Sequence, residues 1–414
     1  MSKRWPSSFV SEQRLWDRLA AMARFGATAA GGVNRQALSD EDTAAQIELV
    51  QWGEELGLAA SRDAAGNLFL RLAGAEPDSA TILSGSHLDS QPTGGRFDGV
   101  YGVLAALEAV QAIQQAGAVP RHPIDIVAWM NEEGSRFAPG MMGSAVFAGD
   151  RTLAETVVVS DAKGTSVADA LAAQAKRLAH VPLRTLGGTV RAYVEAHIEQ
   201  GPVLEREGFP VGVVTGIQGK HTFRVEVQGE AAHAGTSQRS ERKDALLAAT
   251  AMVQALAAAL HDLEDITRFT VGRFEVLPNA PSVVASKVVF SIDLRHPDSA
   301  TLRDLSAQVT PICDAQRGPC EVTVLRLSAA DSLRFPEVLC QHTRTVADRL
   351  GIRHRDLPSA AGHDARYLHD VAPSAMLFVP CHLGITHNEA ESATPADLAA
   401  GTRVLADLLL ELAA

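Results

Sequence analysis

Residues 81–117 read TILSGSHLDSQPTGGRFDGVYGVLAALEAVQAIQQAG, and this stretch decides the fold. Its first part, 81–86, is a short apolar run that predicts a buried strand, and 99–117 has the apolar spacing of a helix. A second buried strand, IDIVAWM, is predicted at 124–130. A strand, a helix and a strand in this order indicate an α/β fold class with a mainly parallel sheet.

The pattern changes between 213 and 328. Here HTFRVEVQGEA, FTVGRFEVL and SKVVFSIDLRH alternate in the way of half-exposed antiparallel strands, with the helix of DALLAATAMVQALAAAL among them. The α/β pattern then resumes and ends in a helix at 395–412. We therefore expect a discontinuous α/β domain over 1–212 and 329–414, into which an α+β domain with an antiparallel sheet, 213–328, is inserted.

Composition excludes several classes of protein. Lys and Arg number 37 against 49 Asp and Glu, a net charge of −12 without a basic block, so we expect no nucleic-acid partner. The chain contains no run of about 20 apolar residues and no signal-like apolar start, which predicts a cytoplasmic protein that does not enter a membrane. The four cysteines form no C-x-x-C pair, so packed, reduced thiols are expected.

Polar clusters follow both predicted strands, SHLD after the first and NEEGSR after the second. In open α/β sheets, chemistry collects where such strands end. Each residue alone has an ordinary structural interpretation: His87 and Asp89 as a turn, Glu132 and Glu133 as a solvated pair, and His197 as a core histidine.

Taken together, the polar residues indicate a metal site. The candidate ligands are His87, Asp98, Glu133, His197 and His387. Imidazole and carboxylate ligands suit Zn, Mn, Co or Ni better than Ca, and the lack of cysteine excludes a thiolate-rich structural zinc. Asp98 lies in a Gly-rich turn and could bridge two divalent metal ions about 3.5–4 Å apart. Glu132, beside Glu133, could stay free as a proton carrier.

The order of motifs H-x-D, G-G-x-F-D-G, N-E-E-G-S-R-F, H-I-E-Q-G-P-x-L-E, A-G-H-D-A and T-H-N-E-x-E resembles the amidase, hydantoinase/carbamoylase family of the di-zinc exopeptidase superfamily. The family includes N-carbamoyl-L-amino acid hydrolases, β-ureidopropionases and allantoate amidohydrolases. NEEGSRF and HIEQGPVLE are the most specific of these motifs. The resemblance implies a catalytic di-metal domain, an inserted lid and dimerisation domain, and hydrolysis of the ureido C–N bond of a small ureido acid.

The resemblance also implies roles for individual residues. Asp98 would bridge the two metals, Glu132 would be the general base, and Asp89 would hold the ring of His87. His233, in AAHAGTS, would stabilise the oxyanion. The implied substrate-binding residues are Gln200, His233, Arg295, Gly362 and His363.

This chain departs from the family pattern at three positions. Thirteen residues before Arg295 the family usually has Asn, and here Ser282 stands there, with Asn279 three residues earlier. Whether Ser282 or Asn279 takes the place of that Asn stays open. Cys381 and Thr386 stand where serine is common, and neither change removes a candidate ligand.

Two other functions are compatible with the ligand set. One is a di-metal aminoacylase or dipeptidase, and the position of Gln200 in HIEQG favours a carbamoylase over it. The other is a catalytically silent binding protein, against which the presence of Glu132 argues. His233 and Arg295 belong to the inserted domain, so the resemblance implies a homodimer whose lid residues act in the same chain or across the interface.

Overall fold

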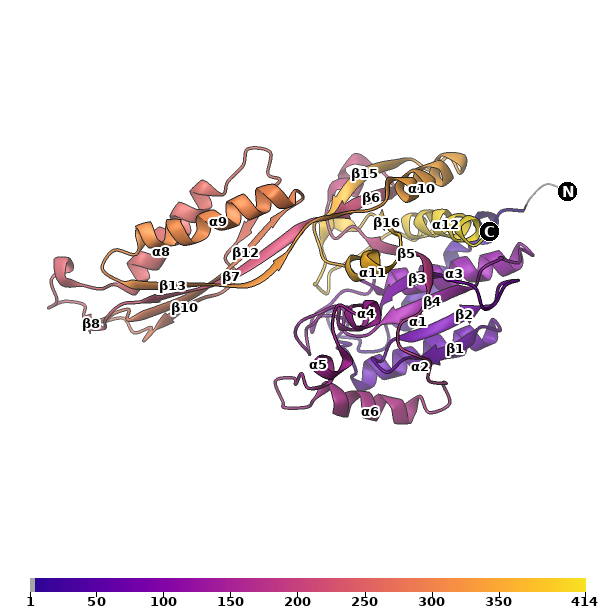
Figure 1. Cartoon of the computed structure of the whole chain (residues 1–414), viewed down its shortest axis with the longest axis horizontal. Helices are drawn as coiled ribbons and strands as arrows, with labels where there is room; N and C mark the ends of the chain where they lie inside the picture. Colours follow the sequence, from indigo (N-terminus) through magenta and orange to yellow (C-terminus); the bar gives the residue numbers. More distant parts are fainter. Residues whose placement is uncertain (1–3) are drawn as a thin grey trace. The chain divides into compact units, whose positions relative to one another are not determined.

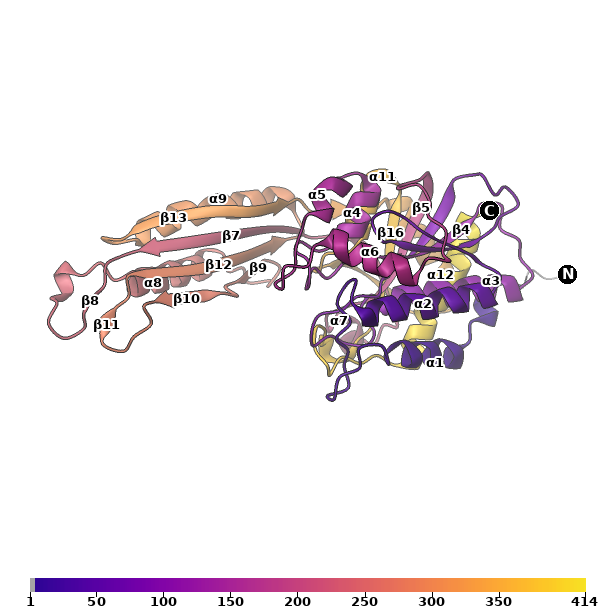
Figure 2. The ribbon, with the colours of Figure 1, turned by 90° about the horizontal axis from the view of Figure 1, so that it is seen from below.

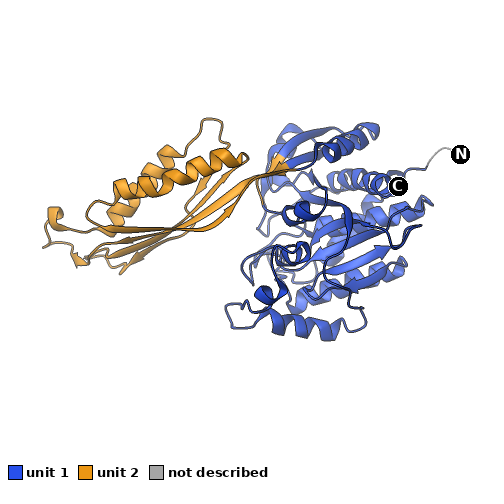
Figure 3. Cartoon of the chain, in the orientation of Figure 1, with its two compact units in different colours: residues 1–215, 335–357, 362–414 blue, residues 216–334, 358–361 orange. Residues whose placement is uncertain are grey.

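A computed structural model describes residues 4–414, which divide into two compact units (Figure 3). Unit 1 comprises the described residues up to Thr215 together with Phe335–Leu357 and Gly362–Ala414. Unit 2 comprises Gly216–Arg334 and Pro358–Ala361. The sequence placed the domain boundaries at 212/213 and 328/329, a few residues earlier in each case.

Most of a nine-stranded mixed sheet lies in unit 1, in the order β1-β2-β4-β3-β5-β16-β6-β14, with β15 paired to β6; β14 and the last two residues of β6 and of β15 belong to unit 2. Its four central strands are mutually parallel: β4 (Ile124–Trp129), β3 (Thr81–His87), β5 (Val190–Ile198) and β16 (Ser374–Val379). The flanking strands are β1 (Ala59–Arg62), β2 (Leu68–Leu72), β6 (Val211–Ile217), β14 (Leu333–Arg334) and β15 (His354–Ser359). The predicted α/β class is confirmed, and the antiparallel strands lie at the two sides of the parallel centre.

Helices cover both faces of this sheet. The helices α3 (Val100–Gln115) and α12 (Pro395–Leu412) pack on one face, and α4 (Met142–Ala148) and α11 (Ala365–Val371) on the other (Figures 1 and 2). The remaining helices of unit 1 are α1 (Glu12–Met22), α2 (Asp40–Glu55), α5 (Leu153–Val157), α6 (Val167–Arg177), α7 (Val203–Glu207) and α10 (Glu337–Arg349), with short 3₁₀ turns at Pro6–Phe9 and His382–Gly384.

The two helices of the first face form where the sequence predicts them. The helix α3 is apolar nearly all round, and most of its side chains are buried between the sheet and α12. The N-cap of α12 is Thr394, whose hydroxyl accepts the N–H of Asp397, and Pro395 occupies the first helical position, where its missing N–H costs nothing. The packing of α3 and α12 against the sheet therefore fixes the position of the edge at which β3, β4 and β5 end.

Unit 2 has a five-stranded antiparallel sheet in the order β10-β12-β7-β13, with β9 also paired to β12. The helices α8 (Ala245–Ala259) and α9 (Ser299–Gln316) pack on one face of it (Figures 1 and 2). Burial alternates along β7, as expected for a sheet with one covered face. The strands are β7 (Gly219–Gln228), β9 (Arg268–Thr270), β10 (Phe274–Leu277), β12 (Lys287–His296) and β13 (Glu321–Ala330), and β8 (Ala232–His233) pairs separately with β11 (Val283–Val284).

Two further predictions can be compared with the described residues. All four cysteines are buried and unpaired, as expected of packed thiols. Within 4–414, no helix combines the length and the apolar character that crossing a membrane would need.

Candidate metal centre

The candidate ligands lie at the carboxyl ends of neighbouring parallel strands of unit 1. His87 is the last residue of β3, His197 the second-last of β5, and Glu133 lies in the turn that follows β4, after Met130, Asn131 and Glu132. Because these ends meet at one edge of the sheet, side chains from distant parts of the chain converge there. Asp98 joins them from the turn before α3, and His387 from the segment after β16.

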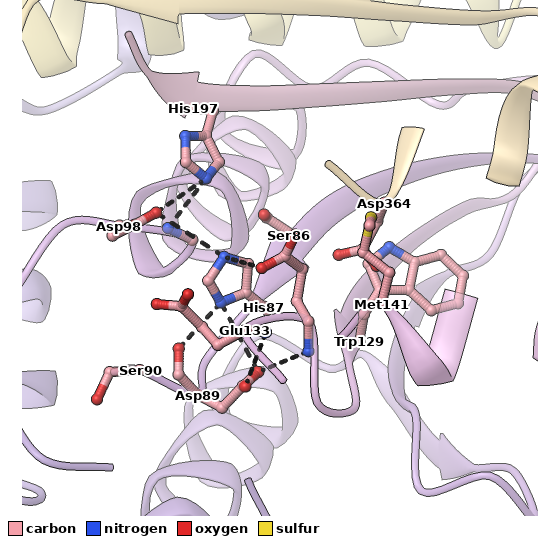
Figure 4. A network of polar contacts seen from close by, with 12 residues as sticks. Ser86, His87, Asp89, Ser90, Asp98, Trp129, Glu133, Met141, His197 and Asp364 are labelled. Carbon is pink, nitrogen blue, oxygen red and sulfur yellow. Dashed lines mark hydrogen bonds and ion pairs between the residues drawn. The ribbon is translucent and has the colours of Figure 1, made fainter. Parts of the chain in front are cut away.

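Two groups of potential ligands share Asp98. His87, Asp98 and His197 form one group and Asp98, Glu133 and His387 the other, with the ligand atoms of each group within 4.8 Å of one another. His87, His197 and Asp98 are buried, whereas the side chain of His387 is 48% exposed. Figure 4 shows His87, His197, Glu133 and Asp98 facing one another.

The two oxygens of Asp98 face different groups. Oδ1 lies 3.2 Å from Nε2 of His197 and 3.9 Å from Nε2 of His87. Oδ2 lies 3.3 Å from Nε2 of His387, which in turn lies 3.2 Å from Oε2 of Glu133. A carboxylate with one oxygen on each side is the arrangement that two neighbouring cations require of a bridging ligand.

The turn that carries Asp98 requires a glycine next to it. Gly99 has φ 67°, and a β-carbon there would lie 2.3 Å from the imidazole of His87. Its backbone N–H also lies 3.3 Å from Nε2 of His197. The absence of a side chain at 99 thus lets the chain pass close to both histidines.

The ring orientations of two histidines are fixed by backbone carbonyls. Nδ1–H of His87 donates to the carbonyl of Asp89 (2.9 Å), and Nδ1–H of His197 donates to the carbonyl of Ile198 (2.9 Å). With Nδ1–H donating, the neutral form of each ring, which is the form that binds a metal, carries its lone pair on Nε2, and in both rings Nε2 is the atom that faces Asp98. Lone pairs opposed to a carboxylate oxygen are stabilised by a cation between them, so the donor set fits a metal ion.

The contacts of Asp89 differ in detail from those expected for its predicted role. Its carboxylate lies 3.7 Å from Nδ1 of His87, while its backbone carbonyl makes the hydrogen bond to that ring. The carboxylate instead accepts the backbone N–H groups of Glu132 and Glu133, both at 3.2 Å. Asp89 therefore holds the His87 ring through its backbone and the Glu132–Glu133 turn through its side chain.

The two adjacent glutamates have different surroundings. Oε2 of Glu133 accepts the side-chain amide of Gln91 (2.8 Å) and contacts His387. Glu132 has its Oε2 3.5 Å from Nε2 of His87, and its carbonyl accepts the N–H of Met141 (2.8 Å). The Glu132 side chain is thus beside the two groups without belonging to either.

Burial and charge shift the pKa values of the site. Burial alone would lower the pKa of His197, but its hydrogen bond and charge interaction with Asp98 raise it to about 9. The pKa of His387 rises to about 10 because Asp98 and Glu133 hydrogen bond to it. Burial, followed by the charge of Glu133, raises the pKa of Asp89 to about 7. A buried cluster so rich in carboxyl groups is one that bound cations would stabilise.

Three of the predicted substrate residues lie in unit 1. The side-chain amide of Gln200 donates to Oδ2 of Asp98 (2.9 Å), and its Oε1 is buried without a hydrogen-bond partner among the described residues. The buried ring of His363 meets that of His197 edge to face, with centroids 4.6 Å apart. A β-carbon at Gly362 would lie 3.3 Å from the methyl carbon of Met141. The fold therefore brings Gln200 and His363 to the candidate ligands.

The other predicted substrate residues belong to unit 2. Nδ1 of His233 accepts the N–H of Gly235 (3.0 Å), so its Nε2 carries the proton when the ring is neutral. The carbonyl of Ser282 accepts the N–H of Ala234 (3.0 Å), which joins Ser282 to the His233 segment. Asn279 is exposed and has φ 55°, an unusual backbone conformation for a residue with a side chain.

Arg295 lies on β12 and is engaged within unit 2. Its Nε and Nη2 donate to the carboxylate of Asp293 at 2.7 and 3.1 Å, and its Nη1 donates to the carbonyl of Ala360 (2.9 Å). Asp293 was not among the predicted site residues, although its spacing of two residues on a strand places it on the same face as Arg295.

Glu391, whose carboxylate is buried beside Asp98, was not predicted either. Glu391 is the last residue of the motif T-H-N-E-x-E that contains His387, so the motif already pointed to this position. Asp364, in A-G-H-D-A, was missed as well, and its Oδ1 accepts the hydroxyl of Ser144 (2.5 Å) in the interior. Both carboxylates are part of the surroundings of the candidate ligands rather than candidate ligands themselves.

Comparisons with known proteins identify the family of the chain. The family described as "Peptidase family M20/M25/M40" matches residues 83–411 of the chain. An N-carbamoyl-L-amino-acid amidohydrolase of Rhizobium meliloti is 39% identical over 409 residues, 98% of this chain and 97% of the relative. An allantoate amidohydrolase of Escherichia coli is 34% identical over 405 residues, 97% of this chain and 98% of the relative.

A solved structure resembles the whole chain. The amidase of the hydantoinase/carbamoylase family from Burkholderia multivorans has a TM-score of 0.90 and 41% identity, covering 98% of this chain and 99% of its own. The family match, the identities and the shared fold all extend over nearly the full length. This chain therefore belongs to the M20 peptidase superfamily and, within it, to the hydantoinase/carbamoylase family of amidohydrolases.

Proposed function

We propose that the protein is a metal-dependent hydrolase that cleaves the carbamoyl C–N bond of N-carbamoyl-L-amino acids and releases the amino acid, ammonia and carbon dioxide. The observation that carries this proposal is the position of Asp98, with one carboxylate oxygen toward each of two ligand groups and Glu132 beside them. The identity of 39% to a carbamoyl amino acid hydrolase, against 34% to an allantoate hydrolase, favours the carbamoyl substrate.

The residues that would hold two divalent cations are those of the two groups, with Asp98 common to both. Zn, Mn, Co and Ni all suit such imidazole and carboxylate ligands. When bound, the cations would act as Lewis acids and lower the pKa of a coordinated water toward neutrality.

Glu132 is proposed as the general base. Its Oε2 faces the ring of His87 from outside both groups, so the carboxylate is free to hold a proton next to the reacting centre. It would accept a proton from the attacking water and deliver it to the departing nitrogen. Asp89 supports this role, because its carboxylate fixes the backbone N–H of Glu132.

Arg295 and His233 are proposed to recognise the substrate from unit 2. A guanidinium has the planar fork that matches a carboxylate, and Nε2–H of His233 can donate to the oxyanion that develops on the carbamoyl carbon. Gln200 and the segment Gly362–His363 contribute from unit 1. Ser282 and Asn279 both lie near His233, so either side chain could take the position of the missing family Asn.

The distance between Arg295 and His233 along unit 2 supports a homodimer. Arg295 pairs with Arg268 near one end of β12, whereas Lys287, at its other end, pairs with Leu277, close in sequence to Asn279. At about 3.4 Å per residue, those ends are ~27 Å apart, far longer than a ureido acid. His233 lies with β8 and β11 at the Lys287 end (Figure 2). We therefore propose that unit 2 is a lid and dimerisation domain, and that His233 serves the active site of the partner subunit.

A substrate panel tests the proposed reaction. Protein loaded with Mn, Co, Ni or Zn is given N-carbamoyl-L-amino acids, β-ureidopropionate, allantoate and N-acetyl-L-amino acids, and release of ammonia and of the free amino acid is measured. We expect the highest kcat/KM with an N-carbamoyl-L-amino acid. A preference for allantoate or β-ureidopropionate would change the assigned substrate but not the reaction class. Turnover of the N-acetyl compounds alone would make the protein an aminoacylase and overturn the proposal.

A further inference from the structure

The buried carboxylate of Glu391 holds the backbone of the turn that carries Asp98. Its Oε1 accepts the N–H of Phe97 at 2.7 Å and the N–H of Asp98 at 3.1 Å, and the residue is only 2% exposed. A carboxylate that accepts two backbone N–H groups fixes the direction of the peptide planes it contacts.

Thr386 connects this carboxylate to the side chain of Asp98. Its Oγ1 lies 2.9 Å from Oδ2 of Asp98 and 3.1 Å from Oε2 of Glu391. The hydroxyl is therefore between the two carboxyl groups, and it contacts Asp98 on the oxygen that faces His387. Backbone and side chain of Asp98 are both held from the segment 386–391.

The turn leaves space for Glu391. A β-carbon at Gly95 would lie 2.0 Å from the carboxyl carbon of Glu391, so any larger residue at 95 would displace this carboxylate. Glu391 thus packs directly on the backbone of the turn. His387 belongs to the same segment, so displacing Glu391 would move a candidate ligand as well as the turn of Asp98.

We propose that Glu391 and Thr386 are positioning residues that hold Asp98 in its bridging orientation before the metal ions bind. Glu391 fixes the main chain of Asp98, and Thr386 fixes the rotation of its carboxylate. The inference rests on the metal centre of the proposed function and assigns roles to two residues that are not themselves ligands. Partners of this kind change metal affinity by ~10–100-fold when they are removed.

Substitutions at two positions separate positioning from simple packing. Thr386→Val keeps the shape of the side chain and removes its hydroxyl, whereas Thr386→Ser keeps the hydroxyl. Glu391→Gln keeps the size and removes the charge. The control is Thr343→Val, because Thr343 is buried and its hydroxyl donates to the carbonyl of Leu339 within α10, away from the candidate ligands.

Three quantities are measured on full-length protein of each variant. They are the affinity for Co²⁺ by competition with a chromophoric chelator, the visible absorption spectrum of the Co²⁺-loaded protein, and the urea midpoint of the metal-free protein. We expect Thr386→Val and Glu391→Gln to bind Co²⁺ ~10-fold or more weakly, with altered cobalt bands, and Thr386→Ser to restore both. Thr343→Val should match the wild type in affinity and spectrum.

Each outcome has a definite meaning. Wild-type affinity and spectrum in Thr386→Val would overturn the role of Thr386. The same result in Glu391→Gln would overturn the role of Glu391. A lower urea midpoint with unchanged cobalt binding would make the contacts packing contacts and overturn the inference. If Glu391→Gln does not fold, Thr386→Val and its serine rescue decide. Wild-type protein that binds no Co²⁺, Mn²⁺, Ni²⁺ or Zn²⁺ would overturn the metal centre itself, which is a different failure.

Discussion

The guanidinium of Arg295 makes two parallel hydrogen bonds with the carboxylate of Asp293, at 2.7 and 3.1 Å, two residues earlier on the same strand. Burial would raise the pKa of Asp293, but the bonds and charge of Arg295 hold it below its usual value. Asp293 therefore keeps Arg295 in one orientation and sets the direction in which its remaining N–H groups point.

The first prediction concerns this arginine. Arg295→Lys keeps the charge but loses the planar fork, so we expect the KM for an N-carbamoyl amino acid to rise ~10-fold or more, with a smaller change in kcat. Steady-state kinetics provide the measurement, and Arg303→Lys, at an exposed ion pair with Asp331, is the control. Unchanged KM in Arg295→Ala would mean that the residue serves only the sheet of unit 2.

Asp98 is the residue whose loss should remove the most metal. It belongs to both ligand groups, so Asp98→Ala weakens two sites, whereas His387→Ala weakens one. We expect the Asp98 variant to retain less than one ion per chain and the His387 variant to retain about one. Metal analysis after gel filtration measures this, and equal metal content in the two variants would argue against a bridging role.

Replacing the proposed general base, Glu132, should lower the catalytic rate without lowering the metal content. Glu132→Gln preserves the size of the side chain and lies outside both ligand groups, so the metal content should match that of the wild type. The rate should fall by ~10²–10⁴-fold because the proton carrier is lost. Metal analysis and kcat on the same preparation test both parts. A variant with full metal content and normal turnover would exclude Glu132 as the base.

The thiols should be unreactive in the folded protein. All four cysteines are buried, and burial raises the pKa of Cys313 to about 11 and that of Cys381 to about 12. Since the thiolate is the reactive form, we expect almost no reaction with an aromatic disulfide reagent at pH 8, and reaction of all four thiols in concentrated urea. Fast labelling of a thiol under native conditions would show that its segment opens.

A pH effect on stability is expected from Asp63. Burial raises its pKa to about 6, despite hydrogen bonds from Asn67 and Ala65. A raised pKa in the folded state means that the protonated carboxyl stabilises the fold below about pH 4 and that this contribution, ~3 kcal/mol, is lost as the pH rises through 6. The difference in unfolding free energy between wild type and Asp63→Asn should therefore shrink from pH 5 to pH 7. Urea titrations of metal-free protein measure it, and a difference independent of pH would contradict the assignment.

The sequence predicts those elements whose burial follows a simple pattern. The strands and helix of 81–130 are correct because continuous apolar runs and apolar helical spacing are visible without knowledge of any partner. His387 was predicted from the order of the motifs instead, since the residues around it show no periodic apolar pattern. Glu391 escaped prediction because its partners are backbone N–H groups almost 300 residues away in the chain, and backbone groups leave no trace in side-chain patterns.

The parallel pairing of β16 with β5 has a consequence for how the protein is made. All of unit 2 is synthesised between these two neighbouring strands, so the edge of β5 that pairs with β16 stays open until β16 has been synthesised. His387 emerges later still, after β16. The second candidate ligand group is therefore incomplete until residue 387 has been synthesised, and a nascent chain that stops before it offers a full set of ligands only for the first group.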